Sequence, residues 1–184
     1  MQEDHFISEK RKFQLEEGIL ILLLLLSIMG IAITDYSPND GYGYWTIMVF
    51  VFALFSVLIA WLQSNHKDGE FKDIIKDQSI HWATTLLIVG GAFLLLKSGH
   101  LTPHSASLVV LLILSLAIIL DGLRIGLRFS LVGLFLGSSS VLSAFYTTFI
   151  WMDIALAIAI VIGTFLWEYW VNKRAEQTAN QQYE

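Results

Sequence analysis

The chain has no cysteine and only two prolines among its 184 residues. The lack of cysteine excludes disulfides, thiolate zinc sites, iron–sulfur clusters and cysteine nucleophiles. Charge is scarce as well, since 15% of the residues are charged and 55% are hydrophobic. So much apolar surface on so short a chain cannot be packed inside one soluble core. The composition therefore predicts a protein surrounded by lipid.

The motifs of soluble enzymes are also missing. The sequence contains no GxGxxG, Walker loop, HExxH or GxSxG, and no acidic cluster that would hold a metal. No stretch outside the apolar runs is basic and aromatic enough to bind nucleic acid. We therefore expect a protein that is not an enzyme, with no catalytic residues, no cofactor, no metal site and no nucleic-acid partner.

What the sequence does contain is a series of apolar runs. They occupy residues 18–34, 44–62, 86–96, 107–120, 129–149 and 154–171. With its flanks, each run approaches the roughly 20 residues that a helix needs to cross about 30 Å of hydrocarbon. The pattern predicts an all-α integral membrane protein with six transmembrane helices in three antiparallel hairpins.

Turn-forming residues separate these runs. Residues 35–43 are dense in turn formers and predict a loop after the first span. In the second hairpin, Gly99 is placed to end one helix, while Thr102 is placed as the N-cap and Pro103 as the first residue of the next. A tight turn between antiparallel helices follows from this spacing.

The basic residues give an independent test of the number of spans. With both termini inside, all of the 11 lysines and arginines except Lys97 fall on the inner side. This asymmetry is what the positive-inside rule predicts for an even number of spans. We therefore expect a multi-pass protein of the cell's inner (plasma) membrane, with both termini in the cytoplasm.

The segments outside the spans divide the chain. Residues 1–17 are predicted to be a cytoplasmic N-terminal segment, 18–171 the six-helix domain and 172–184 a polar cytoplasmic tail. Within the domain, residues 64–80 are too charged to span. Their apolar positions recur at i, i+3 and i+4 from Phe71, with Gln78 at i+7, which predicts a short amphipathic connector helix lying flat on the inner surface.

Ionisable residues near the membrane are candidate functional groups, because charge there is costly. Asp121 ends the fourth predicted helix, and Arg124 lies three residues further as its natural partner. Glu168 lies in an inner aromatic belt, whereas Asp35 and Asp153 lie at the outer edge, where Asp153 is placed to cap the sixth helix. Roles as interfacial anchors and caps are favoured over a proton or ion path.

The fifth predicted span is the most polar. Gly133 and Gly137 have the small-xxx-small spacing that lets helices approach closely, and Ser139 and Ser143 continue that face. The pattern favours a tightly packed helix interface over a hydrophilic lining for a solute or water path.

The histidines are the remaining candidates for a metal or haem. His100 and His104 are four residues apart, but Pro103 begins a new helix between them, so they do not share a helical face. His81 lies at the opposite end of its helix, and no span has a histidine in its middle, as a transmembrane haem would need. Structural or interfacial roles are favoured.

Two hairpins share a mid-helix glycine followed by a turn proline: Gly30 with Pro38, and Gly90-Gly91 with Pro103. With six spans on under 200 residues, residues 18–171 resemble the HdeD-like acid-resistance membrane protein family. The resemblance implies an inner-membrane stress protein and assigns no catalytic residue.

Two functions follow as expectations. The first is a non-catalytic membrane protein, stress-related or a small accessory subunit of a larger complex, that acts through helix packing. The second is a channel or transporter for protons, ions or a small solute, using Asp121, Glu168 and the serine-rich fifth span. A third class, a redox or lipid-modifying membrane enzyme, is supported by no group of residues in the sequence. The expected partners are the lipid bilayer and either other membrane subunits or further copies of the chain.

Overall fold

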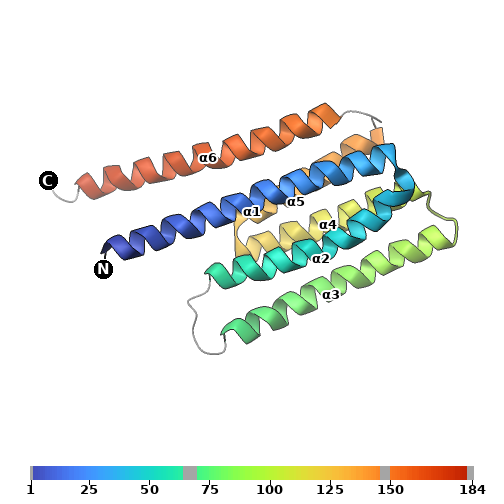
Figure 1. The fold of residues 1–184 in the computed structure, drawn as a ribbon, viewed down its shortest axis with the longest axis horizontal. Coiled ribbons are helices and arrows are strands. Elements are labelled where there is room, and N and C mark those ends of the chain that lie inside the picture. Colours follow the sequence, from blue (N-terminus) through green and yellow to red (C-terminus); the bar gives the residue numbers. More distant parts are fainter. Residues whose placement is uncertain (1, 64–69, 146–149, 182–184) are drawn as a thin grey trace.

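A computed structural model describes residues 2–63, 70–145 and 150–181 of the chain. Within these ranges the protein is a bundle of helices without a strand. The helices are α1 (Gln2–Tyr36), α2 (Pro38–Gln63), α3 (Glu70–Lys97), α4 (Pro103–Ile125), α5 (Leu127–Phe145) and α6 (Ile150–Gln181). Successive helices run in opposite directions, and α1 begins at the same end of the bundle at which α6 ends (Figure 1).

Five of these helices are long and apolar enough to cross a membrane: α1 to α5. The described part of α6 carries a shorter apolar stretch, Trp151–Thr164. Large apolar side chains such as Leu87, Leu94 and Leu166 point outward and are more than half exposed. Outward-facing leucines on every side suit a lipid environment, which confirms the expected class, a membrane-embedded helical protein.

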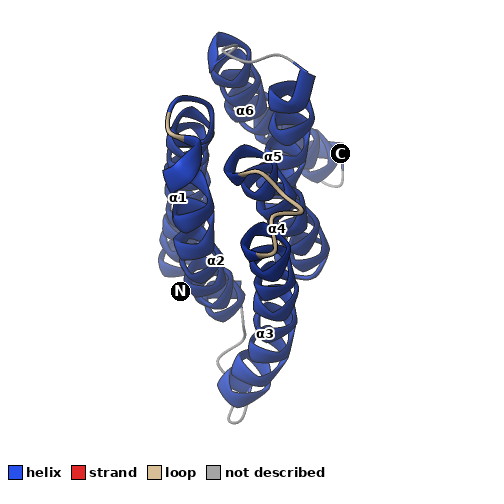
Figure 2. Cartoon of the chain, turned by 90° about the vertical axis from the view of Figure 1, so that its right-hand side faces the viewer, coloured by secondary structure: helices blue, strands red, loops and turns tan. Residues whose placement is uncertain are grey.

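The helix α4 is the centre of the bundle. It packs against α5, α2, α3 and α1. Within the described ranges, α3 contacts only α2 and α4, and α6 contacts only α1 and α5. The end-on view in Figure 2 shows α1 and α2 along one side of the bundle. The largest fully buried side chains include Trp45 and Phe52 of α2, Leu111 of α4 and Phe135 of α5. Leu23 and Ile31 of α1 are equally buried, so the core lies between α1, α2, α4 and α5.

The predicted helix starts in the second hairpin are confirmed. Thr102 is the N-cap of α4, its hydroxyl accepts a hydrogen bond from the Ser105 backbone N–H, and Pro103 is the first helical residue. Gly99 has a φ of +77°, the left-handed conformation that ends α3.

Three other boundaries were predicted wrongly. The expected loop at residues 35–43 is reduced to Ser37, because α2 already begins at Pro38. Its first turn comes so close to its neighbours that a Cβ on Gly41 would lie 2.7 Å from the Ser107 hydroxyl. Residues 70–80 are not a separate surface helix but the first turns of α3. Asp153 does not cap α6, which begins at Ile150, but lies in its first turn.

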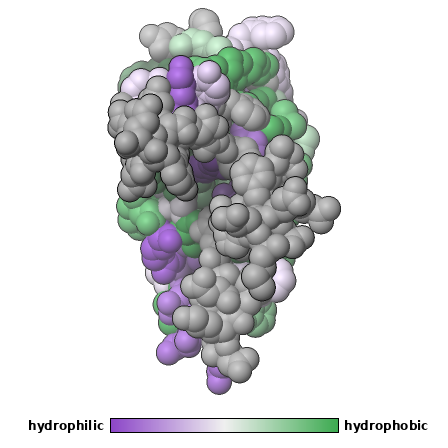
Figure 3. Space-filling view, turned by 90° about the vertical axis from the view of Figure 1, so that its left-hand side faces the viewer, coloured by the Kyte–Doolittle hydropathy of each residue, from purple (hydrophilic) through white to green (hydrophobic). Residues whose placement is uncertain are grey.

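Charged side chains of α3 still mark one end of the bundle. Figure 3 looks at the end where α3 begins and shows hydrophilic side chains gathered there. In α3 they are Lys72, Asp73, Lys76 and Asp77, all exposed. The helix therefore carries its charges beyond the apolar part of the bundle.

Candidate functional site: buried polar clusters

One polar cluster surrounds Asp121 near the C-terminal end of α4, where the side chain is fully buried. Ser56 of α2 donates a hydrogen bond to its Oδ2. Gln78 of α3 donates from Nε2 to its Oδ1 at 2.9 Å. Arg124 of α4 forms an ion pair with the same Oδ1 at 3.0 Å, its side chain 47% exposed. A single carboxylate thus joins three helices.

The orientation of the Gln78 amide is fixed by a tryptophan. Trp82 donates from Nε1 to Gln78 Oε1 at 3.1 Å. An indole N–H can only donate, so the amide atom beside it must be the oxygen, and the NH₂ group must face Asp121. The same Oε1 lies 2.8 Å from the Ser56 hydroxyl oxygen.

The Ser56 hydroxyl lies between two oxygen acceptors. Ser56 has one hydroxyl hydrogen and faces two acceptors, Asp121 Oδ2 and Gln78 Oε1. If the carboxylate carries no hydrogen, one of these two oxygen–oxygen contacts lacks one. The Ser56 hydroxyl can therefore donate to only one of these two acceptors at a time.

The structure joins Asp121 and Arg124. Glu168 is a residue of α6, and its side chain lies outside the described residues. Helix α6 packs against α1 and α5, and no contact between α6 and α4 occurs in the described ranges. A proton or ion path through both Asp121 and Glu168 would therefore have to join two helices that are not adjacent.

Sequence reasoning missed Ser56 and Trp82 and assigned Gln78 to the surface. Ser56 did leave a signal, because it is the one polar residue in the apolar run 47–60. Gln78 and Trp82 are four residues apart, so they share one helix face. What was missing is the pairing of the helices, which the sequence does not show.

The helices α4 and α5 are joined by serines that bridge to backbone carbonyls. Ser115 of α4 donates to the Gly133 carbonyl at 2.7 Å. In the other direction, Ser130 donates to the Ile119 carbonyl at 3.1 Å, and Ser140 donates to the Leu108 carbonyl at 3.2 Å. These three bonds extend along most of α4. We call them the serine seam.

Glycines bring the two backbones close enough for the serine seam. A Cβ on Gly133 would lie 2.9 Å from the Ser115 carbonyl oxygen, and one on Gly137 would lie 2.6 Å from the Ser115 hydroxyl. At the turn, a Cβ on Gly122 would lie 2.8 Å from the Ser130 Cα and closer still to its backbone nitrogen. The predicted face of Gly133 and Gly137 is thus directed at α4.

A second polar cluster lies at the opposite end of the bundle. Ser143 of α5 donates to Asp35 Oδ1 at 2.6 Å. Asp153 of α6 is buried and lies close enough to Asp35 for the two carboxylates to repel each other, and the Ser139 hydroxyl is directed toward it. Among the described residues, neither Ser139 Oγ nor Asp153 Oδ1 closes a hydrogen bond of normal geometry. Ser139 and Ser143 thus lie close together on α5. They are at the end of the bundle opposite to Asp121.

The histidines His81, His100 and His104 each lie beside a polar partner. His100 Nδ1 lies 2.8 Å from the Ser98 hydroxyl, and His104 Nδ1 lies 3.2 Å from the Thr34 carbonyl. His81 Nε2 lies 3.1 Å from the Ala117 carbonyl. In the ranges that the structure describes, no three His, Asp or Glu side chains gather where a metal ion could bind.

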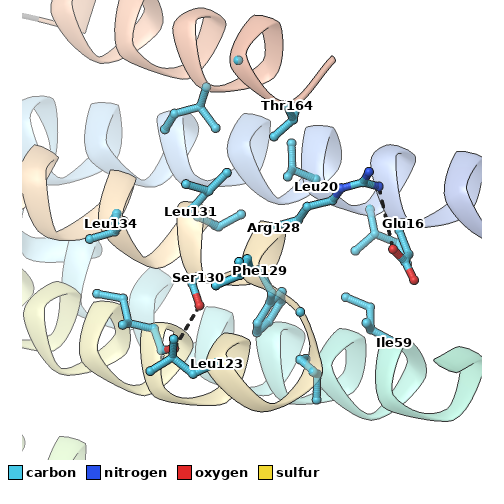
Figure 4. Close-up of a pocket in the computed structure, with 18 residues that line it drawn as sticks. Glu16, Leu20, Ile59, Leu123, Arg128, Phe129, Ser130, Leu131, Leu134 and Thr164 are labelled. Atoms are coloured by element: carbon cyan, nitrogen blue, oxygen red, sulfur yellow. Dashed lines mark hydrogen bonds and ion pairs between the residues drawn. The ribbon is translucent and has the colours of Figure 1, made fainter. Parts of the chain in front are cut away.

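A cavity of about 800 Å³ opens between α1, α5 and α6, next to the α4–α5 turn. Most of its wall is apolar, for example Leu20, Leu131 and Ile160. Figure 4 shows Arg128 reaching from α5 toward Glu16 of α1, with Arg128 Nη1 3.8 Å from Glu16 Oε2. We call this space the α1–α6 pocket.

No family model, curated protein or solved structure matches the chain. The fold and the composition define it as a membrane-embedded helical protein. Any more specific assignment depends on the chain's own residues.

Proposed function

We propose that the protein is a six-span protein of the inner membrane, with both termini in the cytoplasm, that acts through helix packing and without catalysis. Its role would be that of an accessory subunit of a larger membrane complex or of a stress protein of the HdeD-like type. The observation that carries this proposal is the serine seam. Its hydroxyls are used to hold α4 to α5, which is the expected use of small and polar residues between membrane helices.

The outer helices suit such a role. Among the residues that the structure describes, helix α3 contacts only α2 and α4. Leu87 and Leu94 project from it with 76% and 68% of their surface exposed. A Cβ on Gly90 or Gly91 would meet no atom within 4 Å. This face is available to lipid or to a partner helix, while the serine seam keeps the centre rigid.

The test of this proposal is an ion-flux measurement on purified protein in liposomes. A packing protein should leave an imposed pH or sodium gradient intact, at the rate of protein-free liposomes. Mild solubilisation followed by native electrophoresis should show a particle larger than one copy of the chain. Gradient collapse in the liposomes would overturn the proposal.

A second function, a proton or ion path, is favoured by Asp121 itself, a carboxylate fully buried inside the bundle. Acidic residues inside membrane helices form proton relays in pumps and transporters. If this function holds, the wild-type protein should collapse a pH gradient, and Asp121→Asn should block the leak. Asp77→Asn is the matched control, because Asp77 is an exposed acid on α3, and it should leave the leak unchanged.

A further inference from the structure

We infer that one divalent cation of the Ca²⁺ type binds between two carboxylates and two hydroxyls at the end of the bundle opposite to Asp121. The ligands are Asp35 of α1, Ser139 and Ser143 of α5 and Asp153 of α6, which we call the Asp35–Asp153 cluster. Figure 1 shows the end of α1, the end of α5 and the start of α6 at the same end of the bundle. This site does not depend on either function proposed above.

The four side chains of the Asp35–Asp153 cluster are held by three helices that contact one another. Ser143 donates to Asp35 Oδ1 at 2.6 Å. Ser139 lies one helical turn earlier on the same face of α5, with its hydroxyl directed toward Asp153. Both serines and Asp153 are buried, whereas Asp35 is half-buried. A cation can therefore reach the buried oxygens from the side of Asp35.

Two buried oxygens of the cluster are not satisfied by the protein. Among the described residues, Ser139 Oγ and Asp153 Oδ1 have no hydrogen-bond partner. Buried polar atoms of this kind call for a partner. The Ser143 hydroxyl gives its single hydrogen to Asp35, but its oxygen keeps lone pairs. A cation can therefore bind all four side chains without breaking an existing hydrogen bond.

Within the described part of the chain, no basic side chain forms an ion pair with Asp35 or Asp153. Lys97 belongs to α3, and its ammonium group lies 5.5 Å from the centre of the Phe93 ring of the same helix. His104 of α4 directs its Nδ1 to the Thr34 carbonyl oxygen, at 3.2 Å, and not to a carboxylate. Asp35 also lies in the last turn of α1, where the helix dipole favours a cation. The two negative charges therefore need a positive charge from outside the chain.

The donor set favours a hard divalent cation. It contains only oxygens and lacks the imidazole and thiolate groups that zinc prefers. Two carboxylates and two hydroxyls offer up to six oxygens, and Ca²⁺ takes about six to eight, with water as a common further ligand. One divalent ion balances both carboxylates. A sodium ion would leave one negative charge uncompensated, which is costly where the group is buried.

The first experiment measures thermal unfolding of the full chain in detergent after treatment with a chelator. Calcium chloride is then added to about 10 mM, well above a dissociation constant of about 10⁻⁴–10⁻³ M, which is typical of weak protein sites. The melting temperature should rise by about 3–10 °C. Equilibrium dialysis should find one calcium ion per chain. No rise with calcium, or an equal rise with sodium chloride at the same ionic strength, would overturn the proposal.

The second experiment removes one charge of the pair. Asp153→Asn should melt no lower than the wild type in chelator, because the repulsion between the carboxylates is relieved, and calcium should no longer raise its melting temperature. Asp40→Asn is the matched control, since Asp40 is an exposed acid in the first turn of α2, and it should keep the full rise. An undiminished rise in Asp153→Asn, or a lower melting temperature in chelator, would contradict the proposal.

Two neighbouring serines test the hydroxyl ligands. Ser139→Ala removes an uncharged ligand and should weaken calcium binding by about three- to tenfold, the effect of one polar contact. Ser140→Ala is the matched control, because Ser140 is also buried but donates to the Leu108 carbonyl. This variant should be less stable than the wild type but bind calcium with the same affinity. An equal loss of calcium affinity in both variants, or in neither, would overturn the assignment of Ser139 as a ligand.

Discussion

Two substitutions of Asp121 separate two contributions to stability: the charge of the carboxylate and its hydrogen bonds. Asp121→Asn removes the charge but keeps a planar group of the same size. The Asn Oδ1 can accept from Gln78, and its NH₂ group can donate to Ser56, which then donates to Gln78 Oε1. All contacts of the cluster are then satisfied. Asp121→Ala removes the acceptor for Ser56, Gln78 and Arg124 together.

The two substitutions should therefore differ clearly in their cost. Asp121→Asn loses only the charge in its pair with Arg124, whose side chain is 47% exposed, which is worth about 1 kcal/mol or less. Asp121→Ala loses three hydrogen bonds of about 0.6 kcal/mol each, the average between membrane helices. It also leaves the Gln78 NH₂ group buried without a partner, which adds about 1–3 kcal/mol. The alanine variant should be destabilised by about 3–5 kcal/mol in total.

The assay is reversible unfolding in mixed micelles, followed by circular dichroism as the denaturing detergent fraction is raised. Asp77→Asn serves as the control for a simple loss of negative charge and should change the free energy of unfolding by less than about 0.5 kcal/mol. If the asparagine variant is destabilised as much as the alanine variant, the hydrogen-bond reasoning is wrong and the charge of Asp121 is the stabilising element.

Three further outcomes test the packing and the topology. Gly122→Ala places a methyl group against the α5 backbone and should cost about 1–3 kcal/mol of unfolding free energy, whereas Gly90→Ala, in open space, should cost nothing measurable. Ser115→Ala removes one bond of the serine seam and should cost about 0.6 kcal/mol in the same unfolding assay. Cysteines in place of Asp40 and Ser98, both exposed, should react with a membrane-impermeant maleimide from outside intact cells. Labelling only after lysis would refute the proposed orientation.

The sequence predicted those parts of the fold that depend on neighbouring residues. The Thr102 cap and the Gly99 stop are correct because a cap and a left-handed glycine act within a few residues. The predicted start of α3 is wrong because the charged residues before the apolar run indicate a break in the helix, whereas α3 continues through them. Once a helix has formed, adding a residue costs little, so charged turns can continue an apolar helix into water.

The same distinction, between contacts within one helix and contacts between helices, explains which parts of the candidate site the sequence predicts. The pairing of Asp121 with Arg124 was foreseen because the two residues are three apart on one helix. Ser56 and Gln78 are 65 and 43 residues away from Asp121 along the chain. Their contact depends on how α2 and α3 pack against α4, and hydropathy carries no information on that choice.

The hydroxyls of the serine seam bear on the choice between the two proposed functions. A path for protons needs groups that can pass a hydrogen on, and a hydroxyl has a single hydrogen. Ser115, Ser130 and Ser140 each donate theirs to a backbone carbonyl, which cannot pass it further. A path between the Asp121 cluster and the cluster at Asp153 could not follow the boundary between α4 and α5 without breaking these bonds. Because that boundary is where the buried serines are concentrated, their arrangement favours packing over conduction as the role of the fifth helix.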